Sequence, residues 1–358
     1  MKDAVLALED GTVFEGKGIG VEGVSKGELV FATPYTGYEE ALTDPSYKGQ
    51  VLMFTYPLIG NYGISYKNMQ SDSMKADGLV VREACLNPSH RNAESDIDEF
   101  LKENDACGIS GIDTRLLTTR TRKEGTVKSA IMVGEADKEK ALEEAKNLPE
   151  ITERDLVEKV SPNSPYRIKN DGPKMAILDT GMKKNILNNL KKREFDIKVF
   201  PSDTGIKEIE KFEPDTLFVS NGPGDPRRAR SAINVVKHFV DELPIFGICF
   251  GIQIIALALG GQTYKMKFGH RGGNQPVKDH ETGVVHITSQ NHGFAVDESS
   301  LSGTGLEVTQ TNPNDDTVEA IRHRKKPIEA VQYHPEACPG PRDTEELFFD
   351  RVRKIAGG

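Results

Sequence analysis

The sequence predicts an α+β domain followed by an α/β domain with a mainly parallel, helix-covered sheet. The length of 358 residues leaves room for two hydrophobic cores. In the first part of the chain, strand and helix patterns mix without a regular order, whereas from Pro173 onward they alternate, as in parallel sheets covered by helices. We therefore expect an N-terminal domain at residues 1–150, a linker at residues 151–172 and a second domain at residues 173–358.

The N-terminal domain is expected to open on a β-hairpin. Ala4–Leu8 and Thr12–Phe14 lie on either side of Asp10-Gly11, a dipeptide typical of tight turns. Asp44-Pro45 marks a later turn after a short helical segment. Further strands are predicted at residues 50–55, 78–82 and 106–112, and helices at residues 96–103, 113–123 and 137–147.

The linker is predicted from four prolines among polar residues, at positions 149, 162, 165 and 173. After it, strands are expected at residues 175–179, 197–200, 216–219 and 244–248, with helices at residues 183–192, 205–211, 228–242 and 252–259. Shorter strands follow at residues 263–268, 284–289, 319–322 and 329–333, and a closing helix at residues 343–355. In such a sheet, ligands bind at the carboxyl ends of the strands.

The segment Pro244–Gly261 predicts a sharp turn that carries a nucleophile. Cys249 stands between a buried strand and a helix, with Gly247 and Gly251 on either side, as in the nucleophile elbow. Glycines are needed there because the tight turn leaves no room for a Cβ. The start of a helix also favours a thiolate. The alternative is a buried structural cysteine, since free cysteine is one of the most buried residue types.

A base for this thiol is predicted at His334. Residues i and i+2 of an extended segment project to the same side, so Glu336 can orient the ring. Pro335 favours the extended conformation at His334. The alternative is an ordinary loop histidine. The other histidines of the second domain that we considered are expected to face solvent or loops, namely His270, His280 and His292.

The loop at residues 220–226, SNGPGDP, follows a predicted strand directly. Its glycines and prolines favour a rigid loop whose N–H groups, with that of Phe250, could form an oxyanion hole. A plain Gly/Pro turn is the alternative. The loop, the elbow and the His334 segment are all expected at one edge of the sheet.

Composition excludes several classes of function. The net charge of −9 argues against nonspecific nucleic-acid binding. Four cysteines without a CxxC pair indicate neither a disulfide framework nor a zinc site, so no metal is expected. We find no signal peptide, no apolar run of membrane-spanning length and no Walker A motif, and we expect a cytoplasmic protein that binds no membrane.

Three motifs together, NGPGDP, GICFGxQ and YHPE, resemble the class I glutamine amidotransferases over about 185 C-terminal residues. The N-terminal motifs LEDGTxFxG, TGYEEALTDPSY, YPLIGNYG and GIDTRxLT, with KMKFGHRGGNQPV and SQNHGFAVD later, resemble the small subunits of carbamoyl-phosphate synthases over essentially the whole chain. The first domain would then be the small-subunit domain and the second the amidotransferase domain.

The resemblance implies a nucleophile at Cys249, a general base and acid at His334, and its partner at Glu336. It further implies a set of glutamine-binding positions: Ser46, Gly222, Gly224, Phe250, Gln253, Asn291, Gly293 and Phe294. Ser46 would bring the N-terminal domain into the substrate pocket. Two departures from the family pattern are Ile252, where histidine is usual, and Pro34-Tyr35, where Ser-Met is usual.

The implied reaction is glutamine hydrolysis through a glutamyl thioester. The ammonia would pass to a large subunit, in a heterodimer or a higher oligomer, which combines it with bicarbonate and ATP into carbamoyl phosphate for pyrimidine and arginine synthesis. ATP and magnesium would bind the large subunit, and this chain would hold no cofactor. Two other classes remain open: a cysteine hydrolase with another substrate, and a non-catalytic binding module on the same fold.

Overall fold

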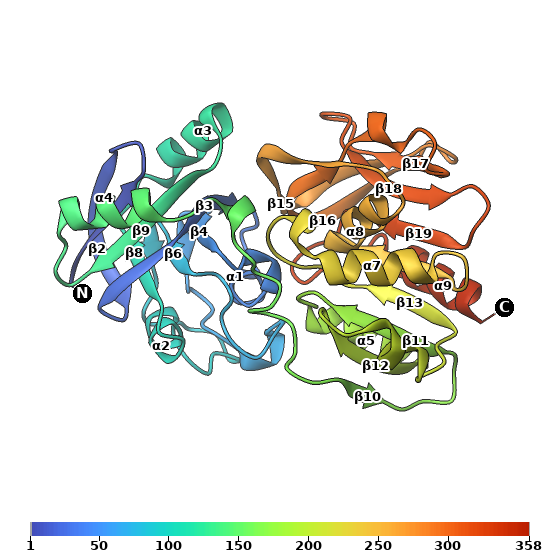
Figure 1. Cartoon of the computed structure of the whole chain (residues 1–358). Coiled ribbons are helices and arrows are strands. Elements are labelled where there is room, and N and C mark those ends of the chain that lie inside the picture. Colours follow the sequence, from blue (N-terminus) through green and yellow to red (C-terminus); the bar gives the residue numbers. More distant parts are fainter. Residues whose placement is uncertain (1, 358) are drawn as a thin grey trace. The chain divides into compact units, whose positions relative to one another are not determined.

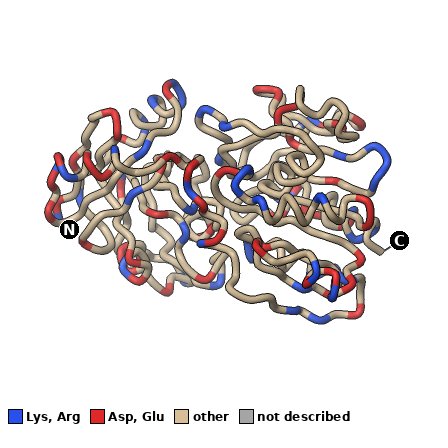
Figure 2. Tube along the Cα trace, viewed as in Figure 1, with Lys and Arg blue, Asp and Glu red and all other residues tan. Residues whose placement is uncertain are grey.

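The structure, a computed structural model, describes residues 2–357 and divides into two compact units, Met1–Arg154 and Asp155–Gly358 (Figure 1). Figure 2 shows basic and acidic residues interspersed along both units. Among the described residues, no helix combines the length and the apolar character that crossing a membrane requires.

The first unit is built on a closed seven-stranded barrel. Closure pairs the edge strands of the sheet with each other. In order around the barrel, the strands are β1 (Asp3–Leu8), β2 (Val13–Gly20), β8 (Cys107–Ser110), β6 (Gly78–Val80), β4 (Gln50–Phe54), β3 (Gly23–Ala32) and β9 (Val127–Val133). A separate parallel pair consists of β5 (Leu58–Ile59) and β7 (Glu83–Ala84).

Helices cover parts of this barrel. Phe100 and Leu101 of α2 (Ile97–Glu103) pack in one core cluster with Leu52 and Leu79 of the strands. Ala141 of α4 (Lys138–Asn147) packs against Val5, Ala7 and Met132. The predicted helices lie close to the observed ones, but the sequence did not predict closure of the sheet. The helical elements are α1 (Tyr38–Leu42), η1 (Pro45–Tyr47), η2 (Tyr66–Asn68), α2 (Ile97–Glu103), α3 (Thr114–Glu124), α4 (Lys138–Asn147) and η3 (Ile151–Glu153).

The second unit contains a ten-stranded sheet. Its strand order is β10 (Tyr166–Ile168), β12 (Asp196–Pro201), β11 (Lys174–Asp179), β13 (Thr216–Val219), β14 (Ile245–Ile248), β19 (Ile328–Val331), β18 (Val318–His323), β17 (Leu306–Thr311), β15 (Thr263–Asp279) and β16 (Val285–Val296). β10 falls within the predicted linker and pairs antiparallel with β12.

The sheet is mixed rather than mainly parallel. The strands from β12 to β19 in this order pair in parallel, and all other pairings are antiparallel. The expectation of a mainly parallel sheet is therefore correct only for the part that alternates with helices. β15 and β16 are longer than predicted and form an antiparallel ribbon with register shifts, and β17 was not predicted.

Helices cover both faces of the parallel part, because successive strand residues point to opposite sides. Ala176 and Leu178 of β11 belong to the cluster with α7 (Arg230–Phe239) and α8 (Phe250–Ala258). Met175 and Ile177 belong to the cluster with α5 (Lys184–Lys192) and α9 (Glu345–Ala356). The helices of this unit are α5 (Lys184–Lys192), α6 (Ile206–Glu210), η4 (Pro226–Arg228), α7 (Arg230–Phe239), α8 (Phe250–Ala258), η5 (Glu298–Leu301) and α9 (Glu345–Ala356).

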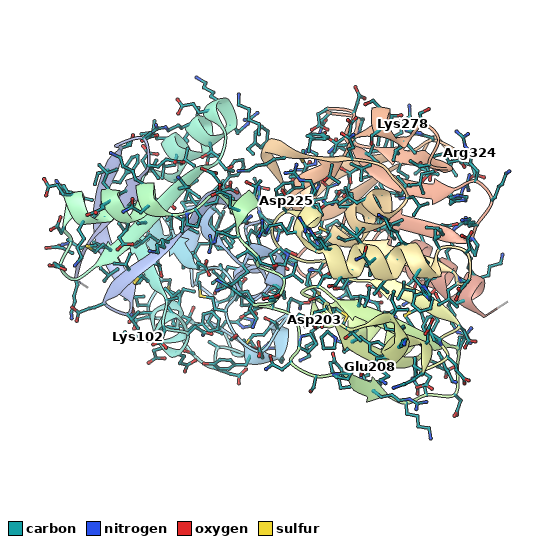
Figure 3. All side chains as sticks on the ribbon, in the orientation of Figure 1. Lys102, Asp203, Glu208, Asp225, Lys278 and Arg324 are labelled. Atoms are coloured by element: carbon teal, nitrogen blue, oxygen red, sulfur yellow. The ribbon has the colours of Figure 1, made fainter. Side chains whose placement is uncertain are left out.

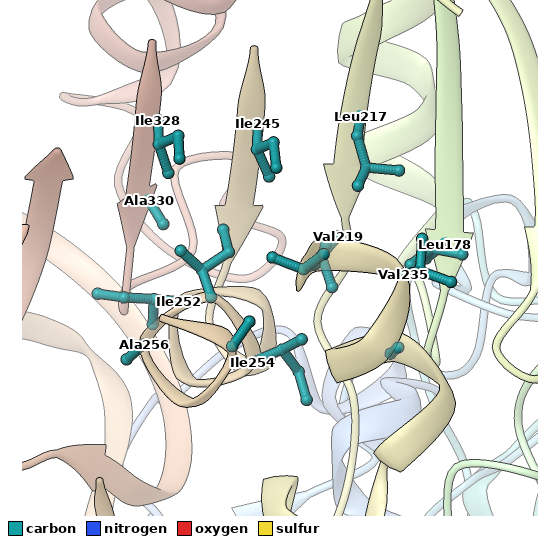
Figure 4. Packing of buried hydrophobic residues seen from close by; sticks show 14 of the residues in the cluster. Leu178, Leu217, Val219, Val235, Ile245, Ile252, Ile254, Ala256, Ile328 and Ala330 are labelled. Carbon is teal, nitrogen blue, oxygen red and sulfur yellow. The ribbon is translucent and has the colours of Figure 1, made fainter. Parts of the chain in front are cut away.

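Helix α8 packs closely on the sheet. Figure 4 shows Ile252 and Ala256 of this helix beside Ala330 of β19, and both helix residues are buried. Ile252, one of the two departures from the family pattern, therefore fills the core behind the elbow. A Cβ at Gly251 would lie 2.3 Å from the carbonyl oxygen of Val219, so this glycine permits the close approach of α8 to β13.

Gly251→Ala should therefore destabilise the fold by about 1–3 kcal/mol, as overpacking of a tight core does. Denaturant unfolding of both proteins measures the change. Gly205→Ala is the control, because a Cβ at Gly205 meets nothing within 4 Å and its φ of −70° suits alanine. Equal stabilities for the Gly251→Ala variant and the native chain would contradict this account of the helix–strand contact.

Candidate active site

The candidate residues of the second unit gather at the carboxyl ends of adjacent parallel strands. Lys183 follows β11, the loop at residues 220–226 follows β13, Cys249 follows β14, and His334 follows β19. These four strands are hydrogen-bonded neighbours. The sheet therefore brings residues as far apart in the sequence as Lys183 and His334 to one edge, as expected for a ligand site in this type of sheet.

Cys249 has a strained backbone. Its φ of 55° and ψ of −99° lie outside the regions that most residues adopt, at an expected cost of about 1–3 kcal/mol. Its N–H donates to the carbonyl of Val331 at 2.8 Å, which ties the turn to β19. A Cβ at Gly247 would lie 2.7 Å from the carbonyl carbon of Gly251, so both glycines are required where the sequence predicted them.

The Cys249 side chain is 2% exposed, and its Sγ lies 3.6 Å from the backbone carbonyl oxygen of Asn291. The residue directly precedes α8, as the elbow prediction requires. Phe250 is the first residue of that helix. The thiol thus lies between the helix start and the β16 backbone.

His334 and Glu336 form a buried pair. Nδ1 of His334 lies 2.6 Å from Oε1 of Glu336, and the N–H of His334 donates to the carbonyl of Ser289 at 2.8 Å. Its other ring nitrogen, Nε2, is buried and has no hydrogen-bond partner among the described residues. Because Glu336 can only accept while ionised, Nδ1 carries the proton and Nε2 is left for proton transfer.

Lys183 adds a buried positive charge to this pair. Its Nζ lies 3.1 Å from the same Oε1 of Glu336 and also donates to the carbonyl of Ala337. The Asn185 side chain donates to the Glu336 carbonyl at 2.6 Å. Lys183 and Glu336 are 3% and 0% exposed, so neither charge is solvated and each needs the other.

These neighbours shift the pKa values in opposite directions. Burial alone lowers the pKa of His334, but the negative charge of Glu336, together with the neighbouring Cys249 side chain, outweighs it and raises the value to about 10. Burial raises the pKa of Glu336, whereas Lys183 and His334 lower it more strongly, to about 2. At neutral pH the glutamate is therefore ionised and the imidazole is held in its charged form.

The loop at residues 220–226 is rigid and closely packed. Asn221 Oδ1 accepts from the N–H of Lys183 at 3.0 Å, and a Cβ at Gly222 would lie 2.4 Å from the carbonyl oxygen of Thr180. Gly224 has a φ of +81°. Asp225, labelled in Figure 3, accepts from the Arg227 N–H and so caps η4.

The other predicted binding residues of this unit lie in α8 and β16. Gln253 donates through Nε2 to the carbonyl of Phe294 at 2.8 Å and also meets Oε1 of Gln332 at 3.1 Å. Asn291 and Gly293 lie in β16. Gln253 is 2% exposed, so its amide fixes β16 to α8.

Ser46 lies in the first unit. It is a buried residue of η1, and its N–H donates to Oδ1 of Asp44 at 2.9 Å. The Asp44-Pro45 turn is thus present as predicted. The proposed contact of Ser46 with substrate stays a prediction.

The sequence did not predict a role for Lys183 or Gln332. Lys183 opens a predicted helix and carries no local signal, whereas Gln332 lies at the end of a predicted strand, directly before the YHPE motif, and that position was the available signal. The prediction that His270 and His292 face solvent or loops is wrong, since both are buried at 6% and 5% exposure, whereas His280 is exposed. Polar and Gly-rich neighbours misled the prediction, because burial in an antiparallel ribbon depends on strands distant in sequence.

Known proteins resemble this chain over nearly its whole length. Residues 6–131 match the family described as carbamoyl-phosphate synthase small chain, CPSase domain, and residues 176–354 match class-I glutamine amidotransferases. A carbamoyl phosphate synthase small chain of Methanosarcina acetivorans is 55% identical over 99% of both chains. The chain belongs to the carbamoyl-phosphate synthase small-chain family. Other members of the family are the small chains of Archaeoglobus fulgidus, 51% identical over 97% of both chains, and of Aquifex aeolicus, 47% identical over 99% of this chain and 100% of the other.

The opposite pKa shifts predict how Glu336→Gln changes stability with pH. The depressed pKa of Glu336 stabilises the fold above pH 4.5, and this contribution is lost as the pH falls to about 2. The raised pKa of His334 stabilises it below pH 6.5, and this contribution is lost as the pH rises to about 10. Glu336→Gln removes both contributions, so between pH 4.5 and pH 6.5 the variant should be less stable than the native chain by about 3–5 kcal/mol, as expected when a buried pair is broken. The difference should shrink as the pH falls toward 2 or rises toward 10.

Denaturant unfolding at a series of pH values measures this difference. Glu346→Gln, a change at an exposed glutamate of α9, is the control and should have little effect at any pH. A stability difference for Glu336→Gln that does not vary with pH would show that the two groups do not share a charge interaction.

Proposed function

We propose that this chain hydrolyses glutamine and delivers ammonia to a carbamoyl-phosphate synthase large subunit. The observation that carries the proposal is the placement of Cys249, His334 and Glu336 at one sheet edge in a member of this family. A thiol nucleophile needs a base and a group that orients the base. The hydrogen bond of 2.6 Å between His334 and Glu336 supports these roles.

In the first half of the reaction, the Cys249 thiolate attacks the carbonyl carbon of the glutamine γ-carboxamide. A C–S bond forms, and backbone N–H groups of Phe250 and of the loop at residues 220–226 stabilise the oxyanion. His334 then donates its Nε2 proton to the departing nitrogen. The C–N bond breaks, leaving ammonia and a glutamyl thioester.

In the second half, water attacks the thioester while His334 accepts its proton. The C–S bond breaks, glutamate leaves, and the thiolate is restored. Glu336 stays ionised throughout and holds the proton on Nδ1 of His334, as an orienting carboxylate does. Lys183 keeps Glu336 ionised, so it is a positioning residue. Gln253, Asn291, Gly293 and Phe294 are proposed to hold the glutamine.

The chain is further proposed to act in a heterodimer with the large subunit, in the cytoplasm, with ATP and magnesium bound by that partner. Support comes from family membership over the full length, because a small chain implies a large one. Hydrolysis releases ammonia here, whereas the use of bicarbonate and ATP would fall to the partner.

Cys249→Ser should abolish glutamine-dependent carbamoyl phosphate synthesis by the complex but leave ammonia-dependent synthesis, because free ammonia bypasses the thioester. Glutamate release and product formation are measured with each nitrogen donor. Cys107→Ser is the matched control, since Cys107 is a buried cysteine of the first unit. Near-native glutamate release by Cys249→Ser would refute the nucleophile assignment.

Ser46→Ala tests the predicted substrate contact in the first unit. Loss of one neutral hydrogen bond costs about 0.5–1.5 kcal/mol, so the glutamine KM should rise severalfold at nearly unchanged melting temperature. Ser73→Ala, at another serine of that unit, should leave the KM unchanged. A lower melting temperature with an unaltered KM would instead assign Ser46 a structural role.

A further inference from the structure

A second group of potentially reactive side chains lies outside the proposed triad. His270 of β15, His292 of β16 and Glu319 of β18 each offer one atom suited to metal binding, and these atoms lie within 4.8 Å of one another. His270 and His292 are direct cross-strand partners. All three residues are buried, and Glu319 is 0% exposed.

The hydrogen bonds of His270 leave one ring nitrogen without a partner. Nε2 lies 2.9 Å from Oδ2 of Asp315, and a carboxylate accepts, so Nε2 carries the proton. Nδ1 makes no hydrogen bond among the described residues. It lies 3.6 Å from Oε1 of Glu319, which is too long for a hydrogen bond. Nδ1 therefore faces the carboxylate without a hydrogen bond between them, and in the neutral ring it presents a lone pair there.

His292 is oriented in the same way. Nδ1 lies 2.9 Å from the backbone carbonyl of Phe294, which can only accept, so Nδ1 carries the proton. Nε2 then presents a lone pair, 3.1 Å from Oε1 of Gln290. Rotating the Gln290 amide would give this nitrogen a donor but would change nothing at His270.

Glu319 is the third unusual group. Both of its carboxylate oxygens are buried, and neither has a hydrogen-bond partner among the described residues. Buried carboxylates are normally hydrogen-bonded, paired with a cation or bound to a metal. At 3.6 Å the contact with His270 is too long for a hydrogen bond, so it leaves both carboxylate oxygens without one.

We propose that His270 Nδ1, His292 Nε2 and a Glu319 oxygen bind one divalent transition metal ion of the zinc type. Two imidazoles and one carboxylate are ligands that zinc, cobalt and nickel accept, whereas magnesium and calcium prefer oxygen alone. Metal-binding histidines usually donate their second ring N–H to a carboxylate or a backbone carbonyl. Asp315 and the Phe294 carbonyl occupy these two positions.

The metal would act on the proposed glutamine site only indirectly. His292 stands between Asn291 and Gly293 in β16, and the carbonyl of Asn291 lies 3.6 Å from Cys249 Sγ. An ion that joins β15, β16 and β18 would fix the strand beside the thiol. It would take no part in the thioester chemistry.

The test uses the full-length chain carrying Cys249→Ser, which removes the active-site thiol as a competing ligand. After chelator treatment and dialysis, the protein is titrated with Co²⁺ and followed by visible absorption, then with competing Zn²⁺. We expect one Co²⁺ per chain, ligand-field bands of a four- or five-coordinate ion and no thiolate charge-transfer band. Glutamine turnover is not measured, so failure of the proposed function cannot affect the result.

Variants in the same background locate the site. Glu319→Gln and His270→Asn should weaken Co²⁺ binding by more than 100-fold, and Asp315→Asn, which leaves all three ligands in place, by about 10–100-fold. His280→Asn, at an exposed histidine of the same unit, should change nothing. Circular dichroism checks that each variant folds. If Glu319→Gln does not fold, Co²⁺ binding by the Asp315→Asn variant still tests the proposal, because Asp315 is half-exposed.

Two results would overturn the proposal. One is a folded chain that takes up no Co²⁺ or Zn²⁺, which would make the cluster a buried His270–Glu319 charge pair. The other is undiminished binding in the Asp315→Asn and His270→Asn variants, which would place the metal elsewhere.

Discussion

The backbone of Cys249 is the constraint on which the second unit depends. A residue with a φ of 55° and a ψ of −99° persists only where the surroundings hold it. Here β14 enters the turn, α8 leaves it, and the Cys249 N–H is tied to β19. The close contact of Gly251 with Val219 exists because α8 must begin directly above the strand end. The turn at Cys249 is thus held in place by the packing of α8, by the glycines on either side and by the neighbouring strands.

The second constraint is charge. Lys183, Glu336 and His334 are all buried, and the Glu336 carboxylate contacts both of the other groups, Lys183 Nζ at 3.1 Å and His334 Nδ1 at 2.6 Å. Each group comes from a loop that follows a parallel strand. The parallel half of the sheet therefore supplies both the strained turn and the charges that face it, and the antiparallel ribbon closes the other side through Asn291.

Local patterns were sufficient to predict the elbow, the His334–Glu336 pair and most helices, because these depend on residues close in sequence. They were insufficient where the structure depends on contacts between strands that are distant in the sequence. Barrel closure joins β1 to β9, and the role of Lys183 requires β11 to lie near the segment after β19. His270 and His292 were expected to face solvent or loops, and no zinc site was expected because the four cysteines show neither a CxxC pair nor a nearby histidine at zinc-ligand spacing. Only the register of the ribbon places these histidines face to face.

The β15–β16 ribbon restricts how this chain can vary in length. Side chains in a strand alternate between two faces, so a single inserted or deleted residue within β16 would exchange the faces of Asn291 and His292. The turn around Thr282 lies at the exposed end of the ribbon, beyond the last paired residues Lys278 and Val285. Relatives should therefore tolerate insertions and deletions at this turn, and keep a constant residue count between it and Phe294.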